Sequence, residues 1–300
     1  MKVLINRKPK NEPWGGGNLF VSALCEQLQK NGHDVVHVLQ PEIDVIFMQD
    51  PRYDDLGISA NEIISYKKNY NSKTKIIHRI NECDARKNTQ GMDDLLSQCS
   101  QHTDITVFVS DWMQNYHIKR GWHCEKYFYV HNGVDKKIFY PREKFNNGKI
   151  NLVTHHWSNN RLKGFDVYDF IDDYVSKNNR FTFTYIGREN GNFKNTKVID
   201  PLFGMALGNE LGKYDVYISG TVNDPGPNHI LESLACEMPT YVYDRGGGAV
   251  EFAGSGHSFS DNDQLVKLLE DTHTLNSYIP KSWEECVQEY IKIMFGDNNG

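Results

Sequence analysis

Three things are scarce in this sequence of 300 residues: long apolar runs, paired cysteines and surplus positive charge. No apolar run approaches the roughly 20 residues that a membrane-spanning helix needs. The six cysteines show no Cys-x-x-Cys pair and no histidine spacing typical of zinc, so neither a disulfide framework nor a zinc site is expected. A formal net charge of −6 argues against a nucleic-acid-binding protein, since such proteins carry a basic surplus.

The amino-terminal apolar stretch is also too short for the core of a signal peptide, so we expect a cytoplasmic protein. Hydrophobic residues make up 39% of the chain and charged residues 24%, which is typical of a soluble globular protein. Chains of this length usually form more than one hydrophobic core. Two domains are therefore expected.

Short apolar stretches typical of buried strands recur along the chain, separated by helical patterns. In the first half they cover residues 2–5, 34–38, 44–48, 75–80, 105–109 and 127–130. In the second half they cover residues 150–154, 181–186, 197–199, 216–219 and 240–243. This alternation predicts an α/β fold of two Rossmann-like halves, with parallel sheets that bind ligands at the carboxyl ends of their strands.

A polar, asparagine-rich stretch at residues 141–149 separates the two alternations and predicts a linker. The expected domains are residues 1–143 and residues 144–281. After them comes an amphipathic helical pattern. Its apolar face consists of Trp283, Val287, Tyr290, Ile291 and Met294.

Residues 224–239 place two acids, Asp224 and Glu232, eight positions apart across a Pro-Gly-Pro turn and a short helix. We expect the helix at residues 229–236, which puts Glu232 near its start. Free backbone N–H groups and the helix dipole favour a phosphate or sugar ligand there. By itself the pattern also fits a buried helix with a carboxylate at its N-terminus.

Cations follow the first strand of the second half. Arg161 and Lys163 stand just before a helical pattern, where they form either a phosphate-binding pair or two exposed charges. His155 and His156 precede them. Because neighbours on a strand point to opposite sides, these two histidines are poor joint ligands for a metal.

Two glycine triplets follow predicted strands. The first, residues 15–17, comes after Trp14 and precedes a helical pattern at residues 19–31, and the second, residues 246–248, follows the strand at 240–243. Each triplet is either a loop that lets the backbone approach a ligand closely or a plain turn.

Two further polar clusters have competing interpretations. His78 and Arg79 stand where a buried strand emerges, which indicates a ligand site, although an ion pair of Arg79 with Glu82 at the rim also fits. The Asp-Asn-Asp at residues 261–263 spells a metal-binding Asp-x-Asp. It begins a helical pattern, so we expect Asp261 to be an N-cap and no metal to be required.

Four motifs stand in order along the chain: Asn132-Gly-Val-Asp135 with Phe139 and Pro141, Lys163-Gly164, Asp224 with Glu232, and Gly247-Gly248-Ala-Val-Glu251. This set resembles the retaining nucleotide-sugar glycosyltransferases of the GT-B fold, in particular glycosyltransferase family 4. The sequence departs from the family where Asp224 replaces a Glu, where Ser158 replaces an Arg and where Glu237 replaces a Gly.

The resemblance implies a GT-B fold, in which two Rossmann-like domains have parallel sheets that face each other across a cleft. It implies that the turn after Asn132 closes the first domain and that the terminal helix, residues 282–296, packs back on that domain. It also implies a hexosyltransferase that moves a sugar from a nucleotide-diphosphate donor to an acceptor hydroxyl with retention and without a metal or other cofactor.

The resemblance further implies the roles of individual residues. Glu232 would bind the ribose hydroxyls, Asp224 would hold the transferred sugar, and Lys163 would neutralise the diphosphate. The implied catalytic residues are Asp224, Lys163 and His78. The implied donor-binding residues are Gly16, Gly17, Arg161, Lys163, Asn228, His229, Glu232, Gly247 and Gly248.

The implied acceptor is a carbohydrate, glycan or glycolipid, selected by loops of the first domain such as residues 50–59 and 82–92. Basic and aromatic residues between Tyr116 and Tyr129 fit peripheral membrane contact, or equally an ordinary helix and strand. Two other functions fit the sequence. One is a nucleotide-sugar epimerase or hydrolase on the same fold, and the other is a non-catalytic sugar-binding or scaffold protein.

Overall fold

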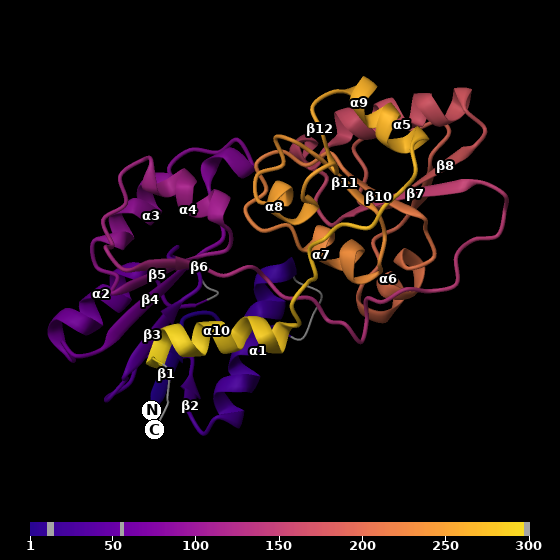
Figure 1. Ribbon diagram of the computed structural model, residues 1–300. Coiled ribbons are helices and arrows are strands. Elements are labelled where there is room, and N and C mark those ends of the chain that lie inside the picture. The colour runs from indigo at the N-terminus through magenta and orange to yellow at the C-terminus, as the bar shows by residue number, and fades with distance from the viewer. Residues whose placement is uncertain (11–14, 55–56, 297–300) are drawn as a thin grey trace. The chain divides into compact units, whose positions relative to one another are not determined.

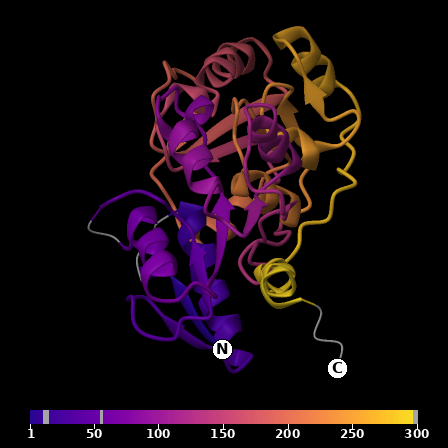
Figure 2. The ribbon, with the colours of Figure 1, turned by 90° about the vertical axis from the view of Figure 1, so that its left-hand side faces the viewer.

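The computed structural model describes residues 1–10, 15–54 and 57–296, which form two compact units with one parallel sheet each (Figures 1 and 2). The first unit comprises the chain up to Asp84, residues 88–133 and the segment from Trp283 onward, and the second comprises residues 85–87 and 134–282. The two α/β halves predicted from the sequence are confirmed.

The first sheet has the strand order β2-β1-β3-β4-β5-β6, with all neighbours parallel. Its strands are β1 (Lys2–Ile5), β2 (Asp34–Val36), β3 (Val45–Met48), β4 (Lys75–Ile80), β5 (Ile105–Phe108) and β6 (Tyr127–Tyr129). Helices α1 (Gly15–Lys30) and α10 (Trp283–Phe295) cover one face. The short η1 (Asp84–Arg86) follows β4, and the other face carries α2 (Ala60–Asn69), α3 (Met92–Ser100) and α4 (Asp111–Ile118) (Figure 1).

The second sheet has the order β12-β11-β10-β7-β8-β9 and is also parallel. Its strands are β7 (Ile150–His156), β8 (Phe181–Gly187), β9 (Lys197–Ile199), β10 (Val216–Ser219), β11 (Thr240–Tyr243) and β12 (Ser258–Phe259). Helices α5 (Phe165–Lys177) and α9 (Asn262–Glu270) cover one face. The other face is covered by α6 (Gly204–Leu211), α7 (Asn228–Ala235) and α8 (Ala249–Ala253) (Figure 1).

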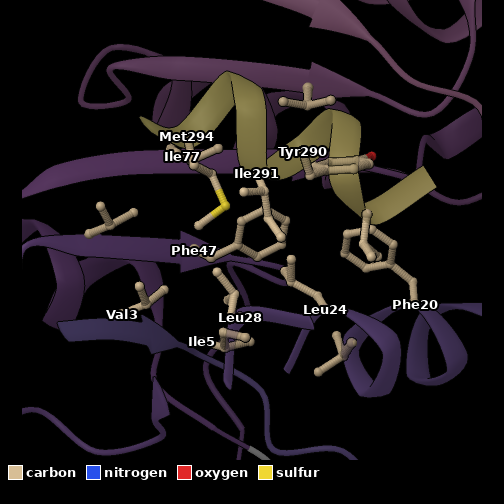
Figure 3. Close-up of a cluster of buried hydrophobic side chains, with 14 of the residues drawn as sticks. Val3, Ile5, Phe20, Leu24, Leu28, Phe47, Ile77, Tyr290, Ile291 and Met294 are labelled. Atoms are coloured by element: carbon tan, nitrogen blue, oxygen red, sulfur yellow. The ribbon is translucent and has the colours of Figure 1, made fainter. Parts of the chain in front are cut away.

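The last helix, α10, supplies part of the core of the first unit. Figure 3 shows Tyr290, Ile291 and Met294 of α10 in one apolar cluster with Phe20, Leu24 and Leu28 of α1. The ring centroids of Tyr290 and Phe20 lie 4.7 Å apart, and Tyr290 and Met294 have no exposed surface. In Figure 2 the same helix, drawn in yellow, is seen end-on.

Between the two halves of the sequence, the chain passes from the first unit to the second at Gly133 and Val134, whereas the boundary was expected after residue 143. Val134 and Phe139 are buried in the core of the second unit. Farther along, Lys144 Nζ donates hydrogen bonds to two backbone carbonyls of that unit, at 2.5 and 3.1 Å. The polar stretch expected to be a linker, residues 141–149, is therefore fastened to the second unit by the Lys144 side chain.

Arg79 lies inside the first unit and not at its rim. The residue is 1% exposed, and its guanidinium donates to the Tyr290 hydroxyl at 3.1 Å and to Asn132 Oδ1 at 2.6 Å. It also lies over the Phe20 ring, 4.1 Å from the centroid. The rim ion pair with Glu82 that the sequence allowed is therefore not formed, and Arg79 ties β4 to α10 and to the Asn132 turn.

No helix within the described ranges combines the length and the apolar composition that crossing a bilayer would require.

Candidate functional site at the carboxyl edge of the second sheet

The sequence-predicted donor residues gather where three neighbouring strands of the second sheet end. Lys163 follows β7 in the short helix η2 (Arg161–Lys163), Asp224 follows β10, and the second glycine triplet follows β11. Because parallel strands all end at the same edge, the three connecting loops come together.

Lys163 and Asp224 form a close ion pair. Lys163 Nζ lies 2.6 Å from Asp224 Oδ2, and the two side chains are 17% and 6% exposed. Burial alone would raise the pKa of the Asp224 carboxyl, but the neighbouring Lys163 ammonium holds that pKa well below its usual range. Asp224 is therefore ionised at neutral pH, and an anion and a cation stand side by side at this edge.

The second glycine triplet holds Asp224 by its backbone. The Asp224 N–H donates to the Gly246 carbonyl at 3.2 Å, and the Gly248 N–H donates to the Asp224 carbonyl at 2.8 Å. Gly247 between them has φ +69°, and a Cβ there would lie 2.7 Å from the Asp224 carbonyl oxygen. Glycine is thus required by the contact with Asp224, while a contact of Gly247 and Gly248 with a nucleotide stays a prediction.

The loop that carries Lys163 is fixed in a similar way. Gly164 follows η2 with φ +103°, and a Cβ there would lie 2.5 Å from the carbonyl carbon of Gly220. The Val222 N–H donates to the Leu162 carbonyl at 2.9 Å. The Lys-Gly pair therefore permits a close approach of two backbones, which brings Lys163 within reach of Asp224.

Glu232 lies in the middle of α7 and not near its start, which corrects the expectation. The helix begins at Asn228, one residue earlier than predicted, so Glu232 is its fifth residue and stands away from the free N–H groups. One carboxylate oxygen instead lies 2.6 Å from His155 Nε2 on β7. The side chains of His155 and Glu232 are 9% and 14% exposed, so the pair is largely shielded from water.

His155 is a residue of this site that sequence reasoning considered only as a metal ligand. Its partner Glu232 is 77 positions away, and no local pattern signals such a pairing. The prediction that neighbouring histidines point apart is confirmed, since His156 Nε2 lies 2.6 Å from the Tyr168 hydroxyl on α5. Burial lowers the pKa of His156 well below its ordinary value, so His156 is neutral.

Asn228 and His229 open α7 next to this pair. His229 is 8% exposed, and its Nε2 lies 3.0 Å from the Ser219 hydroxyl at the end of β10. Burial lowers the pKa of His229 well below its ordinary value, so the ring is neutral. The structure brings both residues to the edge that holds Asp224, and their donor-binding role stays a prediction.

Arg161 is paired with two acids of α5. Its guanidinium is paired with Asp166, lies 3.3 Å from Asp169 Oδ2 and donates to the Asn190 carbonyl at 3.0 Å. The side chain is 44% exposed. With two carboxylates already paired to it, Arg161 carries little free positive charge toward the site.

Of the three residues predicted in the first unit, His78 is enclosed. It is 0% exposed inside β4, and both ring nitrogens lack a hydrogen-bond partner. Burial lowers the pKa of His78 to about 3, so the imidazole is neutral. A sugar could reach it only after neighbouring side chains move, and its contact with a sugar stays a prediction.

The first glycine triplet forms a helix turn and not the expected loop. Helix α1 begins at Gly15, and Gly16 and Gly17 continue it, whereas Trp14 lies outside the described residues. At Gly17 a Cβ would meet Gln49 Nε2 at 3.4 Å and Asn81 Nδ2 at 3.6 Å. Amide side chains from the ends of β3 and β4 thus stand beside the first turn of α1.

The first unit also contains a cavity of about 500 Å³. Part of its wall comes from the loop at residues 82–92, which the resemblance associates with acceptor choice. Helices α3 and α4 supply most of the remainder. The lining residues are Asp84, Thr89, Gln90, Gly91, Asp93, Asp94, Ser97, His117, Arg120, Gly121 and Trp122.

Asp261 is the N-cap of α9, as predicted, because its carboxylate accepts a hydrogen bond from the Gln264 N–H at 2.9 Å. Over the part of the chain that the structure describes, no three His, Cys, Asp or Glu side chains are grouped so as to hold a metal ion.

No protein-family model matches the sequence, and no curated protein sequence matches it either. Solved structures do match. The structure of Anabaena Alr3699/HepE in complex with UDP and glucose has a TM-score of 0.66 at 14% identity, over 98% of this chain and 95% of that one. Sucrose-phosphate synthase from Thermosynechococcus elongatus has a TM-score of 0.63 at 13% identity, over 98% and 94%.

WaaG, a glycosyltransferase involved in lipopolysaccharide biosynthesis, has a TM-score of 0.62 at 12% identity and covers 99% of this chain and all of that one, 100%. At such identities the similarity shows the fold alone. The chain has the GT-B glycosyltransferase fold over nearly its whole length.

Proposed function

We propose that this chain is a glycosyltransferase that moves a sugar from a nucleotide-diphosphate donor to an acceptor hydroxyl with retention of the anomeric configuration. The observation that carries the proposal is the Lys163–Asp224 ion pair at the carboxyl edge of the second sheet. In a GT-B fold, this edge is the general ligand-binding position of a Rossmann-like sheet. A cation beside a carboxylate matches a donor that presents phosphates next to sugar hydroxyls.

Each partner of the pair has a distinct role in this proposal. The Asp224 carboxylate accepts hydrogen bonds from hydroxyls of the transferred sugar. The Lys163 ammonium binds the diphosphate and stabilises the negative charge that grows on it as the bond between the anomeric carbon and the phosphate oxygen breaks. Donor binding would replace part of the contact between the two side chains.

Glu232 binds the ribose hydroxyls in this proposal, with one carboxylate oxygen held by His155 and the other available to the ligand. The acceptor oxygen bonds to the anomeric carbon on the face that the phosphate leaves. The acceptor proton passes to the departing phosphate oxygen, so no protein nucleophile and no metal is required. Retention follows because the new bond forms on the same face as the broken one.

We further propose that the acceptor is a carbohydrate, glycan or glycolipid bound by the first unit. The 500 Å³ cavity beside the loop at residues 82–92 supports this assignment because its lining is rich in hydrogen-bonding groups. Exposed aromatic side chains on β6 support peripheral contact with a membrane that carries a lipid-linked acceptor, since Tyr127, Phe128 and Tyr129 are 39%, 38% and 46% exposed.

Thermal unfolding in the presence of UDP, GDP and ADP, each alone and as sugar conjugates, tests donor binding. A ligand at about a hundred times its Kd stabilises the folded state by about 2.7 kcal/mol. The shift should appear with one nucleotide series and should shrink in Asp224→Asn and Glu232→Gln. Absence of any shift would reject the donor site.

Turnover of the donor that binds, measured with and without an acceptor, then distinguishes the remaining functions. Transfer to an added glycan, with the configuration of the product read by NMR, would support the retaining transferase. Release of free sugar or interconversion of the donor without any acceptor would identify a hydrolase or epimerase. Tight binding with no turnover in the presence of a broad acceptor panel would identify a non-catalytic sugar-binding protein.

A further inference from the structure

If the proposed function holds, the donor site needs more positive charge than the Lys163–Asp224 pair provides. A nucleoside diphosphate carries more than one negative charge, and cations that bind it directly stabilise it. Lys163 is already neutralised by Asp224 at 2.6 Å, so this pair contributes no net positive charge. Arg161 is committed to Asp166 and Asp169. Arg86 also acts electrostatically on the Asp224 carboxylate and lines a small pocket with Lys163. A further cation at the same edge, free of carboxylates, would complete the site.

Arg188 lies at the same edge of the second sheet and can supply this further positive charge. It directly follows β8, the strand next to β7 in the sheet, and it is exposed. Its guanidinium lies over the ring of Trp157, with Cζ 4.0 Å from the ring centroid, and Trp157 directly follows β7. Among the residues that the structure describes, no carboxylate is paired with Arg188.

The position of Arg188 is fixed by the register of the two strands. His156 of β7 is the register partner of Gly187 of β8, so the next residues of the two strands, Trp157 and Arg188, face each other. Gly187 has φ +139°, and a Cβ there would lie 1.9 Å from the His156 carbonyl oxygen. Only glycine permits so close an approach, and this approach is what brings the guanidinium over the indole.

Two further contacts hold the loop after β8 and the indole in place. The Tyr185 hydroxyl donates to the Arg188 carbonyl at 3.0 Å, and Asn190 Nδ2 donates to the Asn159 carbonyl at 3.0 Å. On its other side, the Trp157 ring meets Phe203 edge-on, with centroids 4.8 Å apart. Although Trp157 is 43% exposed, its contacts with Arg188 and Phe203 limit its motion.

We propose that Arg188, oriented by Trp157, binds the diphosphate of the nucleotide donor together with Lys163. A guanidinium stacked on an aromatic ring keeps its charge, and its N–H donors point outward in its own plane. Those donors match two phosphate oxygens at once. In this arrangement Arg188 supplies the positive charge that the family's Arg would supply at the position of Ser158. Arg161 has a structural role, because it joins η2 to α5.

The test compares Arg188→Gln with a matched control, Arg180→Gln, which removes the same charge from the opposite end of β8, where Arg180 lies over the Phe181 ring. Isothermal titration calorimetry measures the binding of a nucleoside diphosphate, its monophosphate and its nucleoside to each protein, with the base chosen as the one that binds wild type. Arg188→Gln should weaken diphosphate binding at least about tenfold and leave nucleoside binding unchanged. Arg180→Gln should bind the diphosphate as wild type does.

Two additional variants separate charge from stacking. Arg188→Lys keeps the charge and should restore part of the diphosphate affinity, whereas Trp157→Leu keeps Arg188 but removes its support and should weaken binding less than Arg188→Gln. The affinity of wild type should also fall more steeply with added salt than that of Arg188→Gln, because the variant makes one phosphate contact fewer.

Equal diphosphate affinity of Arg188→Gln and wild type would overturn the assignment of Arg188. An equal loss for diphosphate and nucleoside would overturn it as well and would place the base, not the phosphates, against Trp157 and Arg188. If wild type binds none of the nucleotides, the proposed function itself fails. The two failures are therefore distinguished by the wild-type titration alone.

Discussion

The two glycine triplets have the same sequence and different structures. Residues 15–17 form the first turn of the 16-residue helix α1. Residues 246–248 form a turn whose backbone pairs with Asp224 on both sides of Gly247. The difference lies in what each triplet touches. A Cβ at Gly17 would find an ordinary neighbour at 3.4 Å, whereas a Cβ at Gly247 would find backbone at 2.7 Å.

The comparison shows that a need for glycine is decided by tertiary contacts and not by the tripeptide itself. Near the first triplet the neighbours are flexible amide side chains, which can move. Near the second the neighbour is the backbone of Asp224, which cannot. Substitutions at and around the two triplets should therefore differ in size, and this difference can be measured.

The largest effect is expected from Gly247→Ala. The new Cβ would clash with the Asp224 backbone and would force an L-residue to keep φ +69°. We expect a loss of roughly 2–3 kcal/mol in the free energy of unfolding, measured by urea denaturation. Because the loop also positions Asp224, nucleotide affinity should fall as well. A variant as stable as wild type would contradict the role assigned to this triplet.

A smaller effect, dependent on pH, is expected from Asp224→Asn. The pKa of Asp224 is depressed in the folded state, so its ionised form stabilises the protein above its unfolded-state pKa of about 4. The stabilisation is lost as the pH falls below that value toward the depressed pKa. We expect the variant to be less stable by about 1–2 kcal/mol at pH 7.

Urea denaturation of wild type and Asp224→Asn between pH 7 and pH 2 measures this difference. The gap between the two free energies of unfolding should close toward the acid end. A gap that stays constant across the range would mean that the charge of Asp224 does not contribute to stability.

Glu237→Gly should raise the free energy of unfolding, whereas the two substitutions above should lower it. Glu237 is exposed and follows α7 with φ +52°, a conformation that favours glycine. Replacement by Gly should stabilise the protein by about 1 kcal/mol, seen as a raised urea midpoint. Glu237→Ala, the matched control, also removes the carboxylate but keeps a Cβ, and it should leave the midpoint almost unchanged.

Gly17→Ala should have the smallest effect. Alanine is the better helix former, and its Cβ would make an ordinary contact with Gln49 Nε2 at 3.4 Å, so only the small difference in helix propensity remains. We expect the free energy of unfolding to change by less than about 1 kcal/mol. A loss as large as that of Gly247→Ala would show that the two triplets are equally constrained and would break the comparison.

Local patterns were sufficient for much of the fold. Strands buried on both faces are continuous apolar runs, which the sequence displays directly, and the Asp261 N-cap and the apolar face of α10 are equally local. The parallel pairing of the strands was expected, and a parallel sheet brings strand ends to one edge, where Lys163 lies close to Asp224.

The features that the sequence could not determine depend on partners that are distant along the chain. Glu232 pairs with His155 from another strand, and Arg161 pairs with acids of α5 that no motif connects to it. The observed domain boundary lies earlier than expected because the apolar residues Val134 and Phe139 pack into a core that later segments of the chain form. In each instance the sequence gives the residue type, but tertiary packing determines which residue it contacts.

Helix α10 has a consequence for the order of folding. The core of the first unit includes Tyr290 and Met294, which a ribosome adds only after the whole second unit has been made. Until then, apolar side chains of α1 such as Leu24 and Leu28 lack part of their cover. During synthesis, the unit that begins first is thus completed last. The second unit, which consists of residues 85–87 and 134–282, can become compact before it.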